Sequence, residues 1–199
     1  IIASVDMQFS QDDRAGWIHI EDLSDDACVG NVPLSFTFSG WGRNVTSVSV
    51  SSNGVLFFGS GCSNEWNNDV LPSNISQDPF LAFFWDDLID SGSGEFFEYT
   101  TQGAPGGRVF SLYFRNRFLD VTCSASPVNL MISIHEASNL VRVTYSAFSN
   151  CIRTRGSSAT FGLQGPGGAN AKAFNVATNS PVLDDNASRQ SMSFLPPRQ

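Results

Sequence analysis

The sequence predicts an all-β fold, an antiparallel two-layer β-sandwich with a jelly-roll-like arrangement of about a dozen short strands. Apolar residues recur at every second position in many short segments, and turns rich in Gly, Pro and Asn separate these segments. No long segment carries an apolar stripe at helical spacing, so we expect little helix. A chain of 199 residues is long enough for one domain with a large core, and we expect residues 1–199 to fold as a single sandwich.

The first segment, residues 1–10, alternates apolar and polar residues. The alternation predicts a half-buried strand whose apolar face consists of Ile1, Ala3, Val5, Met7 and Phe9. Turn residues then separate further short strands, which we predict at residues 17–21, 34–38 and 46–51. The Asn53-Gly54 pair tolerates the positive φ angles of a type I′ turn, so we predict a tight hairpin over residues 46–58.

Two segments are apolar on both faces, VLFF at 55–58 and FLAFFW at 80–85. Such strands lie between layers or under a covering loop, and we expect them at the centre of a sheet. Residues 61–79 between them have no periodicity and many turn formers, which predicts a long loop. Short alternating strands fill the second half of the chain, at residues 95–100, 108–118, 128–135, 140–148, 158–163, 172–177 and 192–196.

The composition favours a secreted protein. The chain has 17 phenylalanines, a single lysine (Lys172) and a formal net charge of −8, with acidic residues in small groups. Such a charge repels phosphate backbones and anionic lipid heads, so nucleic acid is excluded as a partner. No apolar run reaches the roughly 20 residues that cross a bilayer, so we expect no membrane insertion. The chain begins at Ile1 without Met, which fits a processed mature form or a trimmed one.

The chain has four cysteines and no zinc-ligand spacing among them. Cys123 lies just before one predicted strand and Cys151 just after the next, so a hairpin brings the two within disulfide reach. We therefore pair Cys123 with Cys151 and, by elimination, Cys28 with Cys62. The alternative is four buried free thiols, because a disulfide needs an oxidising compartment. Three glycosylation sequons, which begin at Asn44, Asn74 and Asn186, agree with export, although Asn- and Ser-rich chains also generate sequons by chance.

Four stretches in this order carry a family resemblance: LSFTFSGWGRNVTSVSVSSNGVLFFGS, PFLAFFWDDL, VNLMISIHEASNLVRVTYSA and SATFGLQGPGG. Together they resemble a β-sandwich module of bacterial secreted and cell-surface proteins and, more distantly, the extracellular nidogen-type domain. The resemblance covers residues 33–168 and rests on the SSNG hairpin and the Phe-Trp-Asp-Asp run. It implies an extracellular, mostly non-catalytic module used in adhesion or structural assembly, and it brings no catalytic residues.

The residues themselves give little support to catalysis. There is no G-x-S-x-G motif, and His19 and His135 each follow an isoleucine within a predicted strand, which places them on the polar face. The acids in EDLSDD and FWDDLID lie beside aromatic residues, but a glycosidase needs two carboxylates about 5 to 10 Å apart, a distance that sequence does not supply. We therefore predict that the chain is not an enzyme.

Two ligand sites are candidates. Calcium accepts carboxylate oxygens from loops, and Asp86, Asp87 and Asp90 are the best group, although none of the acidic runs fits the D-x-D-x-D-G loop; solvated turn acids are the alternative. Carbohydrate binding uses exposed aromatic rings, and Trp41 and Trp66 lie in predicted loops. A loop tryptophan can equally close one end of a sandwich. No cofactor other than calcium is expected.

The N-terminal strand is the last candidate. A terminal strand with alternating apolar residues and a turn after it can pair within its own chain or complete the sheet of another copy. We therefore predict an extracellular or cell-surface structural or adhesive subunit, in which residues 1–10 are exchanged between copies to build a filament or layer. The expected partners are other copies of the chain or cell-surface components. The alternative function is a lectin-like module that binds glycans, with or without calcium.

Overall fold

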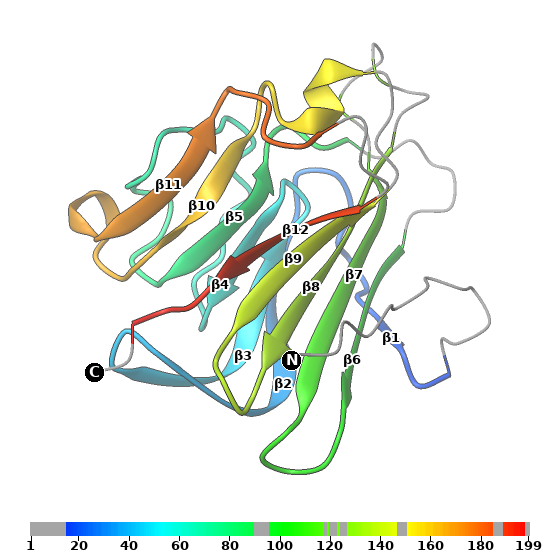
Figure 1. Ribbon diagram of the computed structural model, residues 1–199, viewed down its shortest axis with the longest axis vertical. Coiled ribbons are helices and arrows are strands. Elements are labelled where there is room, and N and C mark those ends of the chain that lie inside the picture. The colour runs from blue at the N-terminus through cyan, green and yellow to red at the C-terminus, as the bar shows by residue number, and fades with distance from the viewer. Residues whose placement is uncertain are drawn as a thin grey trace.

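The computed structural model describes residues 15–89, 96–117, 119, 123, 127–146, 151–184 and 189–197. In these residues twelve strands form two antiparallel sheets that pack face to face (Figure 1). The prediction of an all-β two-layer sandwich is therefore confirmed. The predicted N-terminal strand, with Ile1, Ala3, Val5, Met7 and Phe9, lies outside the described residues.

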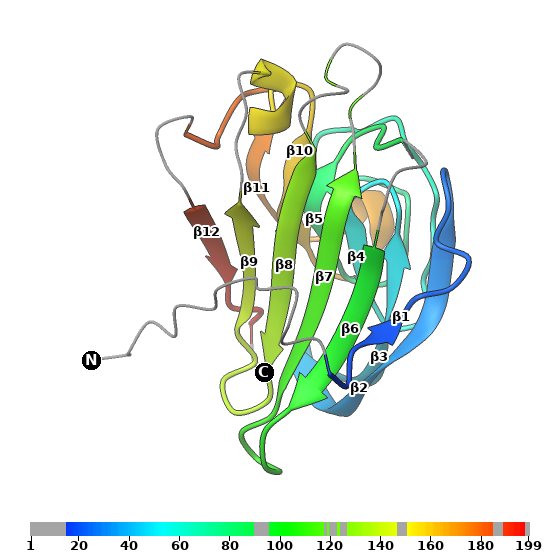
Figure 2. The same ribbon diagram turned by 90° about the vertical axis from the view of Figure 1, so that its right-hand side faces the viewer.

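Each sheet has six strands. Sheet 1 contains, in spatial order, β1 (Ile18–His19), β6 (Phe96–Gln102), β7 (Val109–Arg117), β8 (Val128–His135), β9 (Val141–Ser146) and β12 (Arg189–Phe194). Sheet 2 contains β11 (Ala173–Thr178), β10 (Thr160–Gln164), β5 (Phe80–Trp85), β4 (Val55–Phe58), β3 (Arg43–Ser51) and β2 (Cys28–Gly40). Two short 3-10 helices, Ile152–Arg155 and Gly168–Asn170, precede strands or link them. Figure 2 looks onto sheet 1, with β1 and β12 at its opposite edges.

The main core lies between the sheets and is rich in phenylalanine. On β2 the predicted alternation turns Leu34, Phe36 and Phe38 inward, and all three are buried. The two sheets meet through ring contacts such as that of Phe83 with Phe114, whose centroids are 5.2 Å apart in an edge-to-face arrangement. Tyr145 on β9 is buried and donates a hydrogen bond across the sandwich to the carbonyl oxygen of Phe83. Burial raises the pKa of this phenol well above its usual value.

A second core covers the outer face of sheet 2. The outward residues of β4 and β5 are as buried as the inward ones, because the loop between these strands folds back over them. Leu71 and Ile75 of this loop pack on the outer cluster, which also contains Val55, Phe57, Phe80, Ala82 and Trp85. The Trp85 indole donates a 2.9 Å hydrogen bond to the carbonyl of Glu65 in the loop. The expectation that doubly apolar strands lie under a covering loop is therefore confirmed.

Some local predictions differ from the structure. The hairpin of β3 and β4 forms, but its turn is not of type I′: Gly54 has a φ of +78°, whereas Asn53 has no positive φ. Ser51 pairs with Val55, which leaves three loop residues, and such loops place a left-handed residue only at their last position. The strand predicted over residues 17–21 shrinks to Ile18–His19, since only these two residues pair with β6.

Candidate functional site

The SSNG turn and the FWDD run, which carried the family resemblance, meet in one buried node. Asn53 is fully buried and its side chain makes three hydrogen bonds. Its amide nitrogen donates to Asp26 Oδ1 at 2.8 Å and to the carbonyl of Asn64 at 3.1 Å, and its Oδ1 accepts from the Leu88 amide at 3.1 Å. One asparagine therefore connects the hairpin turn, the covering loop and the end of β5.

Gly54 allows the two motifs to approach each other. Its carbonyl oxygen accepts from the amides of Phe83 and Phe84 at 3.0 and 3.1 Å. A Cβ at this position would lie 1.9 Å from the carbonyl oxygen of Phe84, a distance that no side chain can occupy. The positive φ and the backbone contact both require glycine here.

The same node is joined to sheet 1 by a buried arginine. Arg117 on β7 has no exposed surface, and its guanidinium donates to the carbonyl of Leu88 and to Asp25 Oδ1 at 3.3 Å. The guanidinium also lies 5.5 Å from the centre of the Phe97 ring. Leu88 is therefore hydrogen-bonded from both sheets, which indicates that the node stabilises the fold.

Asp86 of the predicted calcium group is part of this buried region. Its Oδ2 accepts a hydrogen bond from the Ser158 hydroxyl, its Oδ1 accepts from the Asp87 amide at 3.0 Å, and Arg153 lies 4.0 Å away. Burial raises the pKa of Asp86, against the opposite effect of these hydrogen bonds. Asp90 lies outside the described residues. Within the described ranges no group of three His, Cys, Asp or Glu side chains is placed to hold a metal ion, and calcium stays a prediction.

The cysteines pair as the sequence suggested. Cys28 is joined to Cys62, with Cα atoms 5.8 Å apart, at the edge of the covering loop. Cys123 is joined to Cys151, with Cα atoms 6.0 Å apart, at the open end of the β8–β9 hairpin. Disulfides are typical of proteins that fold in oxidising compartments.

The two candidate tryptophans lie in different surroundings. Trp41 is half-buried, and its ring lies 5.3 Å from that of Phe58 and 6.4 Å from that of Phe38. This is the packing of a residue that closes one end of the core, and sugar binding by Trp41 stays a prediction. Trp66, in the covering loop, is 50% exposed. Of the sequon residues, Asn44 and Asn74 are exposed and Asn186 lies outside the described residues, so glycosylation stays a prediction.

Both histidines lie on strands. His19 is exposed on β1 and His135 is half-buried at the end of β8, where its Nε2 lies 3.3 Å from the Ser133 hydroxyl. Burial and the positive charge of Arg142 lower the pKa of His135. A catalytic triad needs a carboxylate beside the histidine, whereas the charge that acts on His135 is a cation. The carboxylate of the neighbouring Glu136 forms an ion pair with the guanidinium of Arg108.

Arg108 and Glu136 connect the β6–β7 turn, the β8–β9 turn and strand β2 at one end of the sandwich. The guanidinium of Arg108 contacts both carboxylate oxygens of Glu136, from Nε at 2.9 Å and from Nη2 at 2.6 Å. The same carboxylate accepts from the backbone amides of Gly106 and Arg108, and the guanidinium donates to the carbonyl of Ser35 on β2. The hydrogen bonds from Arg108 lower the pKa of Glu136 to about 2. The hydrogen bond from Arg108 to Ser35 joins this ion pair of sheet 1 to sheet 2.

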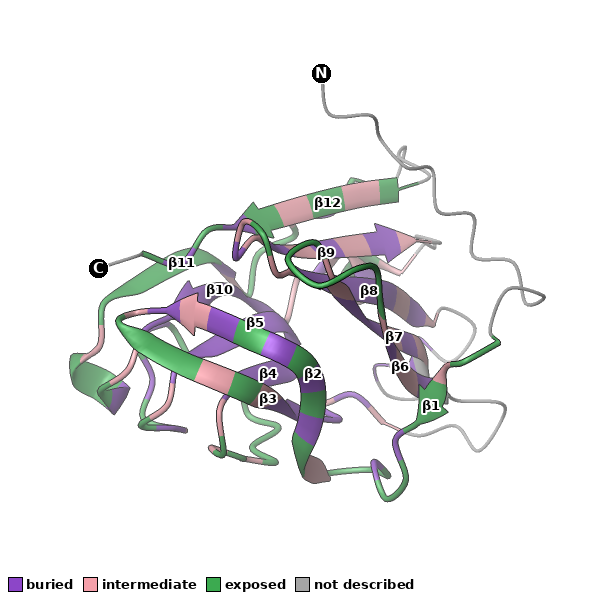
Figure 3. Ribbon diagram, turned by 90° about the horizontal axis from the view of Figure 1, so that it is seen from below, coloured by how far each residue is buried: buried purple, intermediate pink, exposed green. Residues whose placement is uncertain are grey.

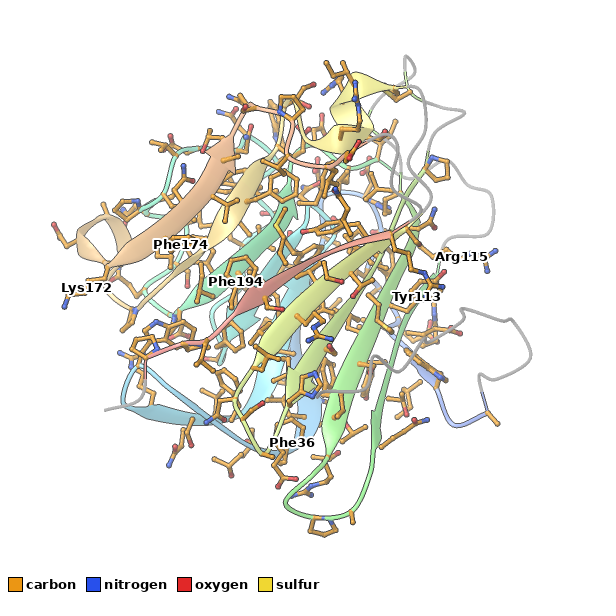
Figure 4. All side chains as sticks on the ribbon, in the orientation of Figure 1. Phe36, Tyr113, Arg115, Lys172, Phe174 and Phe194 are labelled. Atoms are coloured by element: carbon orange, nitrogen blue, oxygen red, sulfur yellow. A yellow bond between two sulfur atoms is a disulfide. The ribbon has the colours of Figure 1, made fainter. Side chains whose placement is uncertain are left out.

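The sequence did not reveal one surface, the inner face of β11. Phe174 is 66% exposed and Val176 is 39% exposed, and β11 is exposed over most of its length (Figure 3). Figure 4 shows Phe174 at the open side of the molecule, away from Tyr113 and Arg115 on β7. The alternation in KAFNVA predicted a strand, but exposure depends on which strands of the other sheet lie opposite. Lys172, the only lysine of the chain, is exposed just before this strand.

An all-β sandwich with two disulfides and a buried structural node defines a disulfide-bonded β-sandwich module of the kind found in secreted proteins. The family model described as NIDO related matches residues 6–198, and the chain therefore belongs to this family. The match extends well beyond the residues that carried the resemblance in the sequence. Searches of curated proteins and of solved structures gave no match.

Family membership and the two disulfides together indicate an extracellular structural or adhesive module. In the part of the chain that the structure describes, no helix is long and apolar enough to span a bilayer.

Proposed function

We propose that this chain is a non-enzymatic structural subunit that works outside the cell and assembles with other copies of itself by lending its N-terminal strand to a neighbour. Membership of the NIDO-related family supports an extracellular structural or adhesive role. The alternating residues 1–9 have the pattern of a strand that needs a partner for its apolar face. Other copies or cell-surface components are the partners, and neither nucleic acid nor a membrane is one.

The observation that carries this proposal is the exposed apolar surface at the open side of the sandwich. Phe174 at 66% and Leu195 at 65% are the two most exposed large apolar residues in the described ranges. Elsewhere the chain covers both faces of its central strands, even where this requires a long loop. Phe174 and Leu195 both exceed the exposure of the other large apolar residues on the described surface, which reaches 53% at Ile18 and Val70, and apolar side chains left this far in solvent favour a binding surface.

Two variants at adjacent positions of the N-terminal strand test the proposal. Met7→Asp places a charge on the apolar face of the N-terminal strand, and Gln8→Asp places the same charge on its polar face. We expect Met7→Asp to abolish the filaments or layers seen by electron microscopy of the full chain and Gln8→Asp to preserve them. Equal assembly of both variants, or no assembly of the unmodified protein at high concentration, would contradict the proposal.

Binding of carbohydrate through Trp66 is a second candidate, favoured by the half-exposed ring among asparagine side chains in the covering loop. Retention of the protein on a glycan array should disappear with Trp66→Ala, while its melting temperature stays unchanged. An array without signal for the unmodified protein, with and without calcium, excludes this alternative. Trp41→Ala is not an equivalent test, because that ring packs against Phe58.

A further inference from the structure

We infer that the acceptor for the N-terminal strand is the free edge of β12 in a second copy, where the incoming strand extends sheet 1 over the uncovered inner face of β11. This inference rests on the proposed function and adds to it the site of contact. In the described part of the chain β12 pairs with β9 alone, so no described strand lies along its other edge.

Sheet 1 ends before sheet 2 does on this side of the sandwich. Phe174 pairs with Leu163 of β10, and residues directly opposite each other in an antiparallel pair point to the same face. Leu163 belongs to the core between the sheets and is only 8% exposed, so Phe174 also projects from the inner face. Its 66% exposure means that no described strand of sheet 1 covers it. In Figure 1, β11 lies beyond β12, the last strand of sheet 1.

The apolar face of the donor decides between the two free edges on this side. A strand added to β11 would extend sheet 2, where nothing in sheet 1 lies opposite, and its five apolar side chains would stay in water. A strand added to β12 would lie opposite β11 and bury those side chains against Phe174. The donor alternates apolar and polar residues as β12 does. On β12, Met192 on the inner face packs against the core, while Ser191 and Ser193 on the outer face are exposed.

The length of the segment favours a donor from another copy. Gly16 is held at the opposite edge of sheet 1, where its carbonyl accepts from the Thr100 hydroxyl on β6. A strand beyond β12 lies six strand spacings from β1, about 29 Å. The seven residue steps from Gly16 to Phe9 span at most about 25 Å when fully extended. A fully extended chain from Gly16 to Phe9 is shorter than the distance to this edge, so a strand that uses all five apolar residues at this edge comes from another copy.

Hydrogen exchange of the full chain, compared between dilute monomer and assembled material, tests the location. About half of the amides in residues 189–194 point away from β9, and we expect their exchange to slow at least about tenfold on assembly. Protection that appears on the edge strands β1, β2 or β11 instead would overturn this inference and leave the proposed function in place. Failure of the protein to assemble at all would overturn both.

A pair of side-chain variants tests the contact itself. Phe174→Ser removes the exposed ring from the proposed contact, and Ile18→Ser removes a residue of similar exposure (53%) from the opposite edge of sheet 1. We expect Phe174→Ser to raise the lowest concentration at which the protein assembles by about tenfold or more, and Ile18→Ser to leave it unchanged. Assembly of Phe174→Ser at the concentration of the unmodified protein would contradict a donor strand that covers β11.

Discussion

The centre and the edge of sheet 2 treat apolar side chains in opposite ways. At the centre, β4 and β5 bury both faces, one against sheet 1 and the other under the loop that joins them. At the edge, β11 leaves Phe174 and Val176 in solvent. The contrast teaches that the covered centre of sheet 2, with the node around Asn53 and Gly54, stabilises the fold, while the edge strand β11 leaves apolar surface for association.

The largest expected effect comes from Gly54→Ala, because the new methyl group would overlap the carbonyl oxygen of Phe84. We expect a loss of about 3 kcal/mol or more in the free energy of unfolding, measured by urea denaturation. Gly106→Ala is the control: its φ is +87° and nothing lies within 4 Å of the added Cβ, so it should cost only about 1 kcal/mol. Equal losses in the two variants would show that the overlap with the carbonyl oxygen of Phe84 does not destabilise the fold.

Asn53→Asp should have the next largest effect. The substitution keeps an acceptor for the Leu88 amide but places a carboxylate oxygen 2.8 Å from that of Asp26 in a buried position. We expect a loss of about 3 kcal/mol in thermal or chemical denaturation. The same substitution at Asn64, which is exposed and donates to the carbonyl of Asp26, should cost no more than about 1 kcal/mol. A tolerated Asn53→Asp would show that the node does not hold the centre together.

The ion pair of Arg108 and Glu136 predicts a pH dependence. Because the pKa of Glu136 falls from 4.5 to about 2 on folding, its contribution to stability is complete above about pH 4.5 and is lost as the pH falls through about 2. Glu136→Gln should therefore flatten the fall of the melting temperature between these pH values. If the acid limb of the two proteins has the same slope, this carboxylate does not contribute in the way that its contacts indicate.

The smallest effect on stability should come from Phe174→Ser, the same change that we expect to impair assembly. A ring that is 66% exposed contributes little to the isolated fold, and the free energy of unfolding of the monomer should change by no more than about 0.5 kcal/mol. A loss above about 1.5 kcal/mol in dilute solution would place Phe174 in the core and end the contrast between centre and edge.

The sequence predicted those parts of the fold that depend on the pattern of apolar and polar residues within one strand. Alternation in LSFTF placed Leu34, Phe36 and Phe38 inside, and the doubly apolar β4 and β5 indicated a covered centre. The pairing of the cysteines followed from the hairpin between Cys123 and Cys151. These features depend on residues that are neighbours along the chain or across one turn.

Features that depend on distant segments could not be predicted. Asn53 was recognised as a turn residue, but its contacts with Asp26 and Leu88 arise only when three segments come together. The type I′ turn was wrong because loop length, not the Asn-Gly pair alone, decides the turn type. The exposure of Phe174 depends on where sheet 1 ends, and the residue pattern of β11 alone does not predict this.

The two disulfides also limit how far the module can lengthen under mechanical load. Cys28 and Cys62 are 34 residues apart and enclose β2, β3 and β4, while Cys123 and Cys151 are 28 residues apart and enclose β8 and β9. A force that pulls on the two ends of the chain passes through the sulfur atoms and bypasses both enclosed segments. Rupture of the sandwich would therefore release a chain roughly 200 Å shorter than the reduced protein, and the enclosed hairpins would bear no tension.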